Sequence, residues 1–205
     1  MSTAGLFLVR GDDAVLLSRA VQELVDQLVG DADRSLVVEE LNERSYLTDD
    51  GGYSIAPLVD AAQTPPFLTE FRVVIGREIG RFSKADDLTS LLGYLEAPLE
   101  STRLVLAWEK GPELQRLNAI PKALQTAIEA AGELVDVRVP RGKAAQGWLE
   151  EQVAASGLSM GRQALRRLAE HLGDERGRLP SLLDTLVATF GVGAELDIAD
   201  VEPVS

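Results

Sequence analysis

The sequence predicts an α/β fold, with a parallel β-sheet flanked by helices over residues 1–140 and a small three-helix domain over residues 141–205. As far as Pro140, short apolar runs alternate with amphipathic segments of helical length. Beyond Pro140 only helical patterns occur, so we place the domain boundary there. A chain of 205 residues is long enough for one large or two small domains with a buried core.

Five apolar runs are the predicted strands, at residues 6–9, 36–41, 71–75, 104–108 and 134–139. The first helix follows the first run, because five apolar residues fall on one helical face: Leu17, Val21, Leu24, Val25 and Leu28. Asp12 and Asp13 suit the N-cap and first turn of this helix, and Gly30 suits its C-terminal end.

The remaining helices follow from the same periodicity. Three are predicted between the strands, at residues 55–62, 88–95 and 124–131, and residues 48–53 form an acidic loop. Three more are predicted in the second domain, at residues 143–155, 160–172 and 179–190, with Ser159 as the N-cap of the middle one.

Composition excludes several classes of site. The chain has no cysteine and one histidine, so it lacks the ligands of a zinc site, and we predict no metal. His171 lies in the last turn of a predicted helix, where its charge suits the helix dipole, and no GxSxG motif accompanies it. No apolar run approaches the roughly 18 residues that cross a bilayer, and no signal peptide is evident. We therefore expect a cytoplasmic protein without membrane contact.

The formal net charge is −13, whereas a protein that binds DNA by itself usually presents a basic face. The segment from Arg138 to Arg178 is richer in Arg and Lys than the acidic residues 1–136, which indicates two units with different surfaces. We interpret Arg162, Arg166 and Arg167 as a solvated helix face.

The layout is that of many P-loop ATPases, but the nucleotide chemistry is missing. A phosphate loop needs GxxxxGK[ST] between the first strand and helix, and here that junction reads RGDDAVLL. Its two carboxylates would repel a triphosphate. Gly142-Lys143 lies at the domain boundary, and Glu109 stands alone where an acidic pair would hold Mg²⁺. We therefore predict no cofactor and no catalytic residue.

Phe67 and Leu68 follow Pro65-Pro66, and two consecutive prolines end a helix. These two apolar residues are thus carried on a constrained loop. Pattern alone favours an assignment to the core of the following strand. The alternative is that they fill a pocket of a partner. Arg72 is interpreted as a strand-edge charge.

Taken in order, several segments resemble the delta subunit of bacterial DNA polymerase III, a member of the sliding-clamp loader. They are LFLVRGDDAVLLSRAVQEL, LVDAAQTPPFLTEFRVVIGRE, TRLVLAWEKG, the PKAL helix, LVDVRVP, WLEEQVAASGLSM, GDERGRLPSLLDTL and LDIADVEP. The resemblance covers essentially the whole chain.

The resemblance implies an AAA+-like module without ATPase activity that binds and opens the sliding clamp for loading on DNA. In that family an apolar pair enters a hydrophobic pocket of the clamp. The matching positions are Phe67 and Leu68, with Pro66 before them and Gln63 at the family's polar position. The family pair is more often Leu then Phe, so the order is reversed here.

The partners implied are the sliding clamp (the beta subunit), the other loader subunits, and DNA only within the assembled complex. Family members continue into a helical collar domain, which would begin where this sequence ends at Ser205, so we expect that domain to be absent. Two rival functions stay open: an atypical nucleotide hydrolase with a degenerate phosphate loop, and a stand-alone AAA+-like adaptor.

Overall fold

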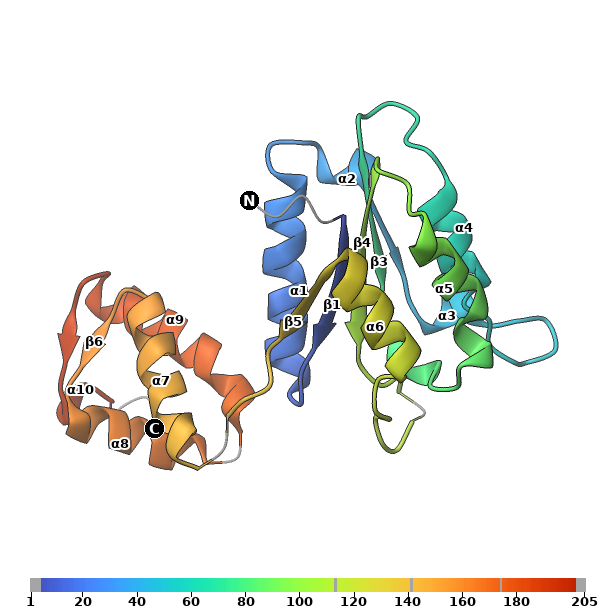
Figure 1. Ribbon diagram of the computed structural model, residues 1–205. Coiled ribbons are helices and arrows are strands. Elements are labelled where there is room, and N and C mark those ends of the chain that lie inside the picture. Colours follow the sequence, from blue (N-terminus) through green and yellow to red (C-terminus); the bar gives the residue numbers. More distant parts are fainter. Residues whose placement is uncertain (1–4, 113, 141, 174, 202–205) are drawn as a thin grey trace. The chain divides into compact units, whose positions relative to one another are not determined.

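A five-stranded parallel sheet forms the centre of the first of two units (Figure 1). The computed structural model describes residues 5–112, 114–140, 142–173 and 175–201. The first unit comprises the described residues up to Gly11 together with Leu17–Val137. The second comprises Asp12–Leu16 and the described residues from Arg138 onward. Residue 141, the predicted start of the second domain, and residues 202–205 at its end lie outside the described residues.

The sheet confirms the predicted fold class. Its strands are β1 (Leu6–Arg10), β2 (Val38–Leu41), β3 (Arg72–Gly76), β4 (Thr102–Trp108) and β5 (Glu133–Asp136). They lie in the order β2-β3-β4-β1-β5, and each neighbouring pair is parallel. Because parallel strands need crossover connections, helices cover both faces, and the strands can be apolar on both.

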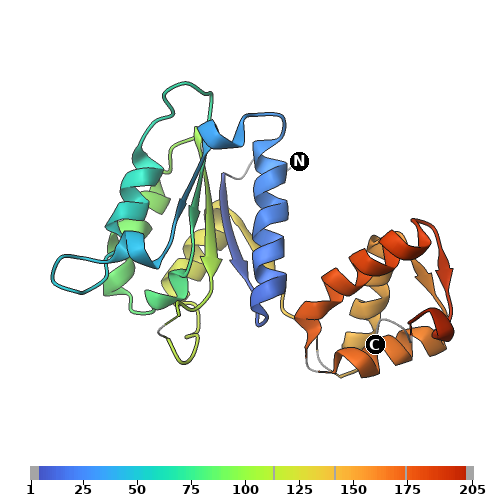
Figure 2. The same ribbon diagram turned by 180° about the vertical axis from the view of Figure 1, so that it is seen from behind.

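Helix α1 (Ala14–Val29) lies on one face of the sheet, and three helices lie on the other: α4 (Ala56–Gln63), α5 (Thr89–Glu96) and α6 (Lys122–Ala131) (Figures 1 and 2). Each face has its own buried cluster, one containing Val21 and Ile75 and the other Leu58 and Val74. The predicted ends of α1 are confirmed at Asp13, which accepts hydrogen bonds from the first turn, and at Gly30, whose φ is 58°.

The prediction of a strand from residue 36 was wrong at its start. Arg34–Val37 form a short helix, α2, and β2 begins only at Val38. The reason is a local cap: the carboxylate of Asp33 accepts hydrogen bonds from the Ser35 backbone N–H at 2.9 Å and from its hydroxyl at 2.7 Å. A second short helix, α3 (Glu43–Tyr46), is capped in the same way by Asn42. Two 3₁₀ turns complete this unit, η1 (Ile79–Arg81) and η2 (Asp86–Leu88).

The second unit contains the three predicted helices and additional elements. Its helices are α7 (Lys143–Ala155), α8 (Arg162–Leu172), α9 (Leu179–Phe190) and the short α10 (Ile198–Val201), with a 3₁₀ turn, η3 (Arg176–Arg178), before α9. His171 lies in the last turn of α8, as predicted, and Arg162 and Arg166 are exposed.

A small parallel sheet in the second unit was not predicted. It pairs β6 (Ser159–Met160) with β7 (Glu195–Leu196). The predicted N-cap role of Ser159 was therefore wrong. Its backbone N–H donates to the Ala194 carbonyl at 2.9 Å, and α8 begins only after Gly161. Within the described residues, no helix is long and apolar enough to span a bilayer.

Leu58 of α4 is fully buried against the sheet, so Leu58→Ala should lower the free energy of unfolding by about 2–5 kcal/mol. The buried Trp108 reports on this unit, and its fluorescence during urea unfolding can be isolated in a Trp148→Phe background. Leu47→Ala, at an exposed position, is the control and should change stability by less than about 0.5 kcal/mol. A loss below 1 kcal/mol for Leu58→Ala would contradict this packing.

Candidate functional site

The loop between α4 and β3 begins with a definite helix end. Thr64 is the C-cap of α4; its backbone is extended, its N–H donates to the Ala61 carbonyl, and its hydroxyl donates to the Asp60 carbonyl at 2.7 Å. Pro65 and Pro66 follow, and neither can continue the helix. The loop therefore leaves the helix abruptly and runs out at the edge of the sheet where β3 begins (Figure 1).

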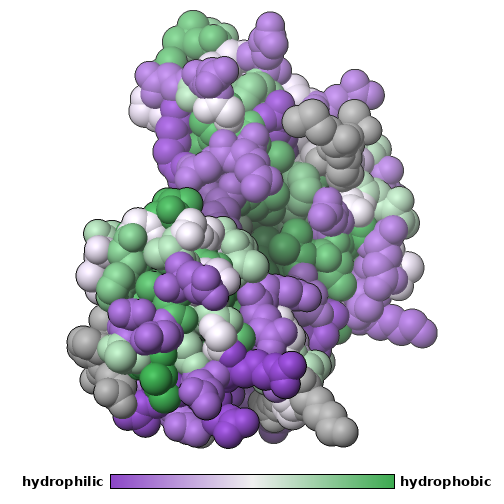
Figure 3. Space-filling model, turned by 90° about the vertical axis from the view of Figure 1, so that its left-hand side faces the viewer, coloured by the Kyte–Doolittle hydropathy of each residue, from purple (hydrophilic) through white to green (hydrophobic). Residues whose placement is uncertain are grey.

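The tip of this loop is apolar and open to solvent. Phe67 is 92% exposed and Leu68 is 74% exposed. Among the described residues, no other large hydrophobic side chain is as exposed as Phe67. In Figure 3, hydrophobic surface lies at the top of the view, where this loop lies in Figure 1. The assignment of these two residues to the core of β3 is therefore contradicted.

The other two predicted site residues lie on the same segment. Gln63 is the last residue of α4 and is exposed, and Pro66 is half-buried beside the tip. The structure thus arranges an exposed polar side chain at the helix end, a rigid Pro-Pro step and an exposed apolar pair. An adjacent exposed apolar pair on an ordered loop is typical of a site for a protein partner.

Hydrogen bonds of buried groups anchor the base of the loop. The Ala62 carbonyl, near the end of α4, accepts bonds from the Tyr94 hydroxyl at 3.3 Å and the Thr102 hydroxyl at 2.9 Å. Burial raises the pKa of Tyr94, against the smaller opposing effect of its hydrogen bonds, so this hydroxyl remains a donor. Thr102 begins β4, so the end of α4 is fixed directly to the sheet.

The Arg72 side chain connects the two ends of the loop by a hydrogen bond. This contact was not predicted from the sequence. The Arg72 guanidinium donates to the Thr64 carbonyl at 3.0 Å and forms an ion pair with Glu39 of β2. At the same edge, the Arg103 guanidinium lies 3.6 Å from the centre of the Phe71 ring. The sequence contains one signal for the contacts of Arg72. It is a positively charged residue directly after a loop, on a strand next to one that carries a carboxylate.

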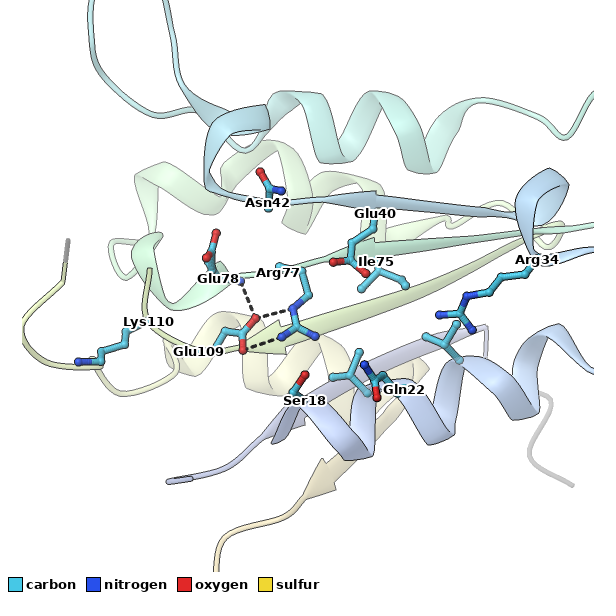
Figure 4. A pocket seen from close by; sticks show the side chains of 12 residues that line it. Ser18, Gln22, Arg34, Glu40, Asn42, Ile75, Arg77, Glu78, Glu109 and Lys110 are labelled. Atoms are coloured by element: carbon cyan, nitrogen blue, oxygen red, sulfur yellow. Dashed lines mark hydrogen bonds and ion pairs between the residues drawn. The ribbon is translucent and has the colours of Figure 1, made fainter. Parts of the chain in front are cut away.

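A polar cavity of about 390 Å³ lies at the opposite end of the strands, where β3 and β4 terminate (Figure 4). Arg77, which follows β3, and Glu109, which follows β4, form a two-pronged ion pair with nitrogen–oxygen distances of 2.6 and 3.1 Å. Glu109 also accepts the Glu78 backbone N–H at 3.3 Å, and the Glu78 carboxylate accepts the Glu43 N–H at 2.6 Å. Glu78 adopts a left-handed backbone, with φ of 60°, to make these contacts.

Burial raises the pKa of both carboxyl groups in this cavity. For Glu109, burial outweighs the lowering by the Arg77 charge and by hydrogen bonds. For Glu78, burial and the Glu40 charge raise the pKa, and Arg77 lowers it. Glu109 directly follows β4, and its carboxylate is paired with Arg77.

In the turn from β1 to α1, an acidic side chain likewise bonds to nearby backbone groups of the same chain. The Asp13 carboxylate accepts the backbone N–H groups of Val15 at 2.9 Å and Leu16 at 3.0 Å. These are the donors that a phosphate loop would present to a nucleotide. Across the described part of the chain, no group of three or more acidic or histidine side chains is placed to hold a metal ion.

The raised pKa of Glu78 predicts a pH-dependent stability. The native state binds more protons than the unfolded chain, so the unfolding free energy falls as pH rises from about 4.5 through the folded-state pKa. Glu78→Gln keeps an oxygen for the Glu43 N–H but cannot titrate. Its stability should therefore improve relative to the parent between about pH 4 and pH 7. Urea unfolding across this range, with the exposed Glu23→Gln as control, checks this. A constant difference would contradict it.

Comparison with known proteins connects this geometry to a family. The family model described as DNA polymerase III, delta subunit, matches residues 7–130, which is more than half of the chain. None of the curated proteins matches the chain.

Two solved structures are similar. The DNA clamp loader delta protein of Bacillus subtilis (YqeN) matches with a TM-score of 0.69 and 16% identity, over 97% of this chain and 57% of that one. A DNA polymerase III gamma subunit-related protein of Thermotoga maritima matches with a TM-score of 0.46 and 20% identity, over 90% of this chain and 58% of that one. This chain thus spans less than two thirds of either protein. The first likeness supports the fold, and the match of the family model shows that the chain belongs to the DNA polymerase III delta subunit family.

Proposed function

We propose that this chain is a non-catalytic clamp-loader subunit that binds the sliding clamp and opens it for loading on DNA during replication. The observation that carries the proposal is the exposed pair Phe67 and Leu68 on a loop anchored at both ends. Family membership supports a partner within the clamp-loading system, and the exposed loop supports the contact. Gln63 and Pro66 complete the proposed contact surface.

The energetics suit a transient anchor. Burying the side chains of Phe67 and Leu68 in a pocket contributes roughly 3–5 kcal/mol before the entropic costs of association. Pro65 and Pro66 restrict the loop before binding, which reduces the ordering cost. An anchor of this strength holds one side of a clamp interface while allowing release after loading.

The remaining partners follow from the same proposal. The chain works beside ATP-hydrolysing subunits of the DNA polymerase III complex, in the bacterial cytoplasm where the chromosome lies. Contacts to those subunits run through the collar domain of the family, and DNA is met within the assembled complex. The chain itself performs no chemistry.

Two arrangements support an inactive nucleotide site. Asp13 places a carboxylate on the N–H groups that would cradle phosphate, and Glu109 is paired with Arg77. Both would have to be broken to admit a nucleotide with its metal. The rival function as an atypical hydrolase requires that rearrangement.

Replacing Phe67 and Leu68 by alanine should abolish most of the clamp affinity. Two interface anchors of about 2 kcal/mol each predict a loss of at least about 100-fold, measured by calorimetry with the clamp of the same organism. Because both side chains are exposed, thermal stability should be unchanged. Leu47→Ala, at another exposed leucine, should bind normally. An affinity within threefold of the parent would contradict the proposed contact, and a parent that does not bind the clamp would favour the stand-alone adaptor.

Equilibrium dialysis with ATP and Mg²⁺ tests the inactive site. We expect no binding at a nucleotide concentration of about 1 mM, which corresponds to less than about 4 kcal/mol of binding free energy. Asp13→Ala frees the helix N–H groups, so this variant tests whether the Asp13 carboxylate keeps nucleotide out of the site. Binding by the parent that is lost on replacing Glu109 would contradict the inactive site and favour the atypical hydrolase.

A further inference from the structure

Arg72 occupies a position on β3 from which one side chain reaches two other elements, the end of α4 and β2. It is the first residue of β3, and its backbone N–H donates to the Ser101 carbonyl at 2.9 Å, so its main chain is fixed to the sheet. Its side chain, 16% exposed, donates to the Thr64 carbonyl at the end of α4 and pairs with Glu39 of β2. A guanidinium has several donors in a fixed plane and can make both contacts at once.

The bond to Thr64 closes the loop at its base. Thr64 is the last residue before the prolines, and Arg72 is the first residue after the loop, so this one contact joins the two ends of the segment. A second contact lies inside it, where the Thr69 hydroxyl donates to the Phe71 carbonyl at 2.8 Å. Closing a loop at its base removes conformations that an open loop would sample.

A second arginine, Arg103, contacts the C-terminal end of the same loop at Phe71. The Arg103 guanidinium covers the Phe71 ring and donates to the Leu28 carbonyl near the end of α1. Cation–π contacts of this kind are worth about 0.5–2 kcal/mol. The loop end at Phe71 is thus held from one side by Arg103, while Arg72 holds the loop start from the other.

We propose that Arg72 is a positioning residue for the clamp contact: it holds Phe67 and Leu68 in their binding arrangement before the clamp arrives, without itself being required to touch the clamp. This inference rests on the proposed function for its partner. The bracing of the loop is a property of the isolated chain and can be tested without that partner.

The predicted effect of Arg72→Gln is kinetic. If the loop of the variant is binding-competent in about a tenth of molecules, the apparent affinity falls about tenfold. The loss should lie in the association rate, because fewer molecules are competent at encounter. The dissociation rate should stay near that of the parent, because the pocket holds the pair once it is bound. Phe67→Ala should behave oppositely, with faster dissociation, because it removes the contact itself.

Long-range attraction by the Arg72 charge would also change the association rate, so the test needs a variant of opposite charge change. Glu39→Gln removes the carboxylate that orients Arg72 and makes the chain more positive. Bracing predicts slower association for both Arg72→Gln and Glu39→Gln. Charge steering predicts changes of opposite sign, and that result would overturn the inference.

Two further variants sharpen the comparison. Arg72→Lys keeps the charge but can reach only one of the two acceptors, so it should restore part of the association rate. Arg10→Gln is the matched control, because Arg10 forms a 2.7 Å ion pair with Asp136 at the other edge of the sheet. It should leave clamp binding unchanged.

Hydrogen exchange of the isolated chain tests the bracing independently. Arg72→Gln should speed exchange of the two hydrogen-bonded amides at the loop ends, those of Thr64 and residue 72, at least about fivefold, while exchange in α6 stays unchanged. Unchanged exchange at the loop ends would overturn the inference and leave the proposed function standing. A parent chain that fails to bind the clamp would overturn the proposed function, whatever the exchange result.

Discussion

The pairing of β3 between β2 and β4 is the constraint on which the candidate site depends. The strand is buried on both faces, with Val73 and Ile75 on one side and Val74 on the other. A shift by one residue would exchange these sets, so the register is strongly fixed. The chain must therefore enter the sheet at Arg72. The apolar pair a few residues earlier then lies beyond the sheet edge, in solvent.

We assign different roles to the two ends of the strands. At the carboxyl ends of the strands, where α/β proteins commonly bind ligands, Arg77 and Glu109 form an ion pair with each other. At the amino ends, Arg72 and Arg103 stabilise a loop whose tip has no partner within the described chain. The stabilising contacts at this second end thus serve an outward-facing surface.

Most of the fold could be predicted because it depends on periodicity, which a single sequence contains. The misses have local causes. Asp33 caps a helix inside a strand-like run, and Ser159 joins a sheet of only two-residue strands, too short to leave a pattern. The exposure of Phe67 was beyond pattern analysis, since an apolar pair before a strand has the same pattern whether it faces inward or outward. The contacts of Arg72 required knowledge of which strands are neighbours.

We propose that the tip of the α4–β3 loop enters a hydrophobic pocket of the clamp. A photo-crosslinking amino acid at position 67, benzoyl-phenylalanine in place of Phe67, tests this directly in a mixture with the clamp, with position 47 as the control. We expect crosslinks from position 67 that map to one apolar pocket of the clamp and none from position 47. Crosslinks from position 67 that are absent, or that scatter over the clamp surface, would contradict it.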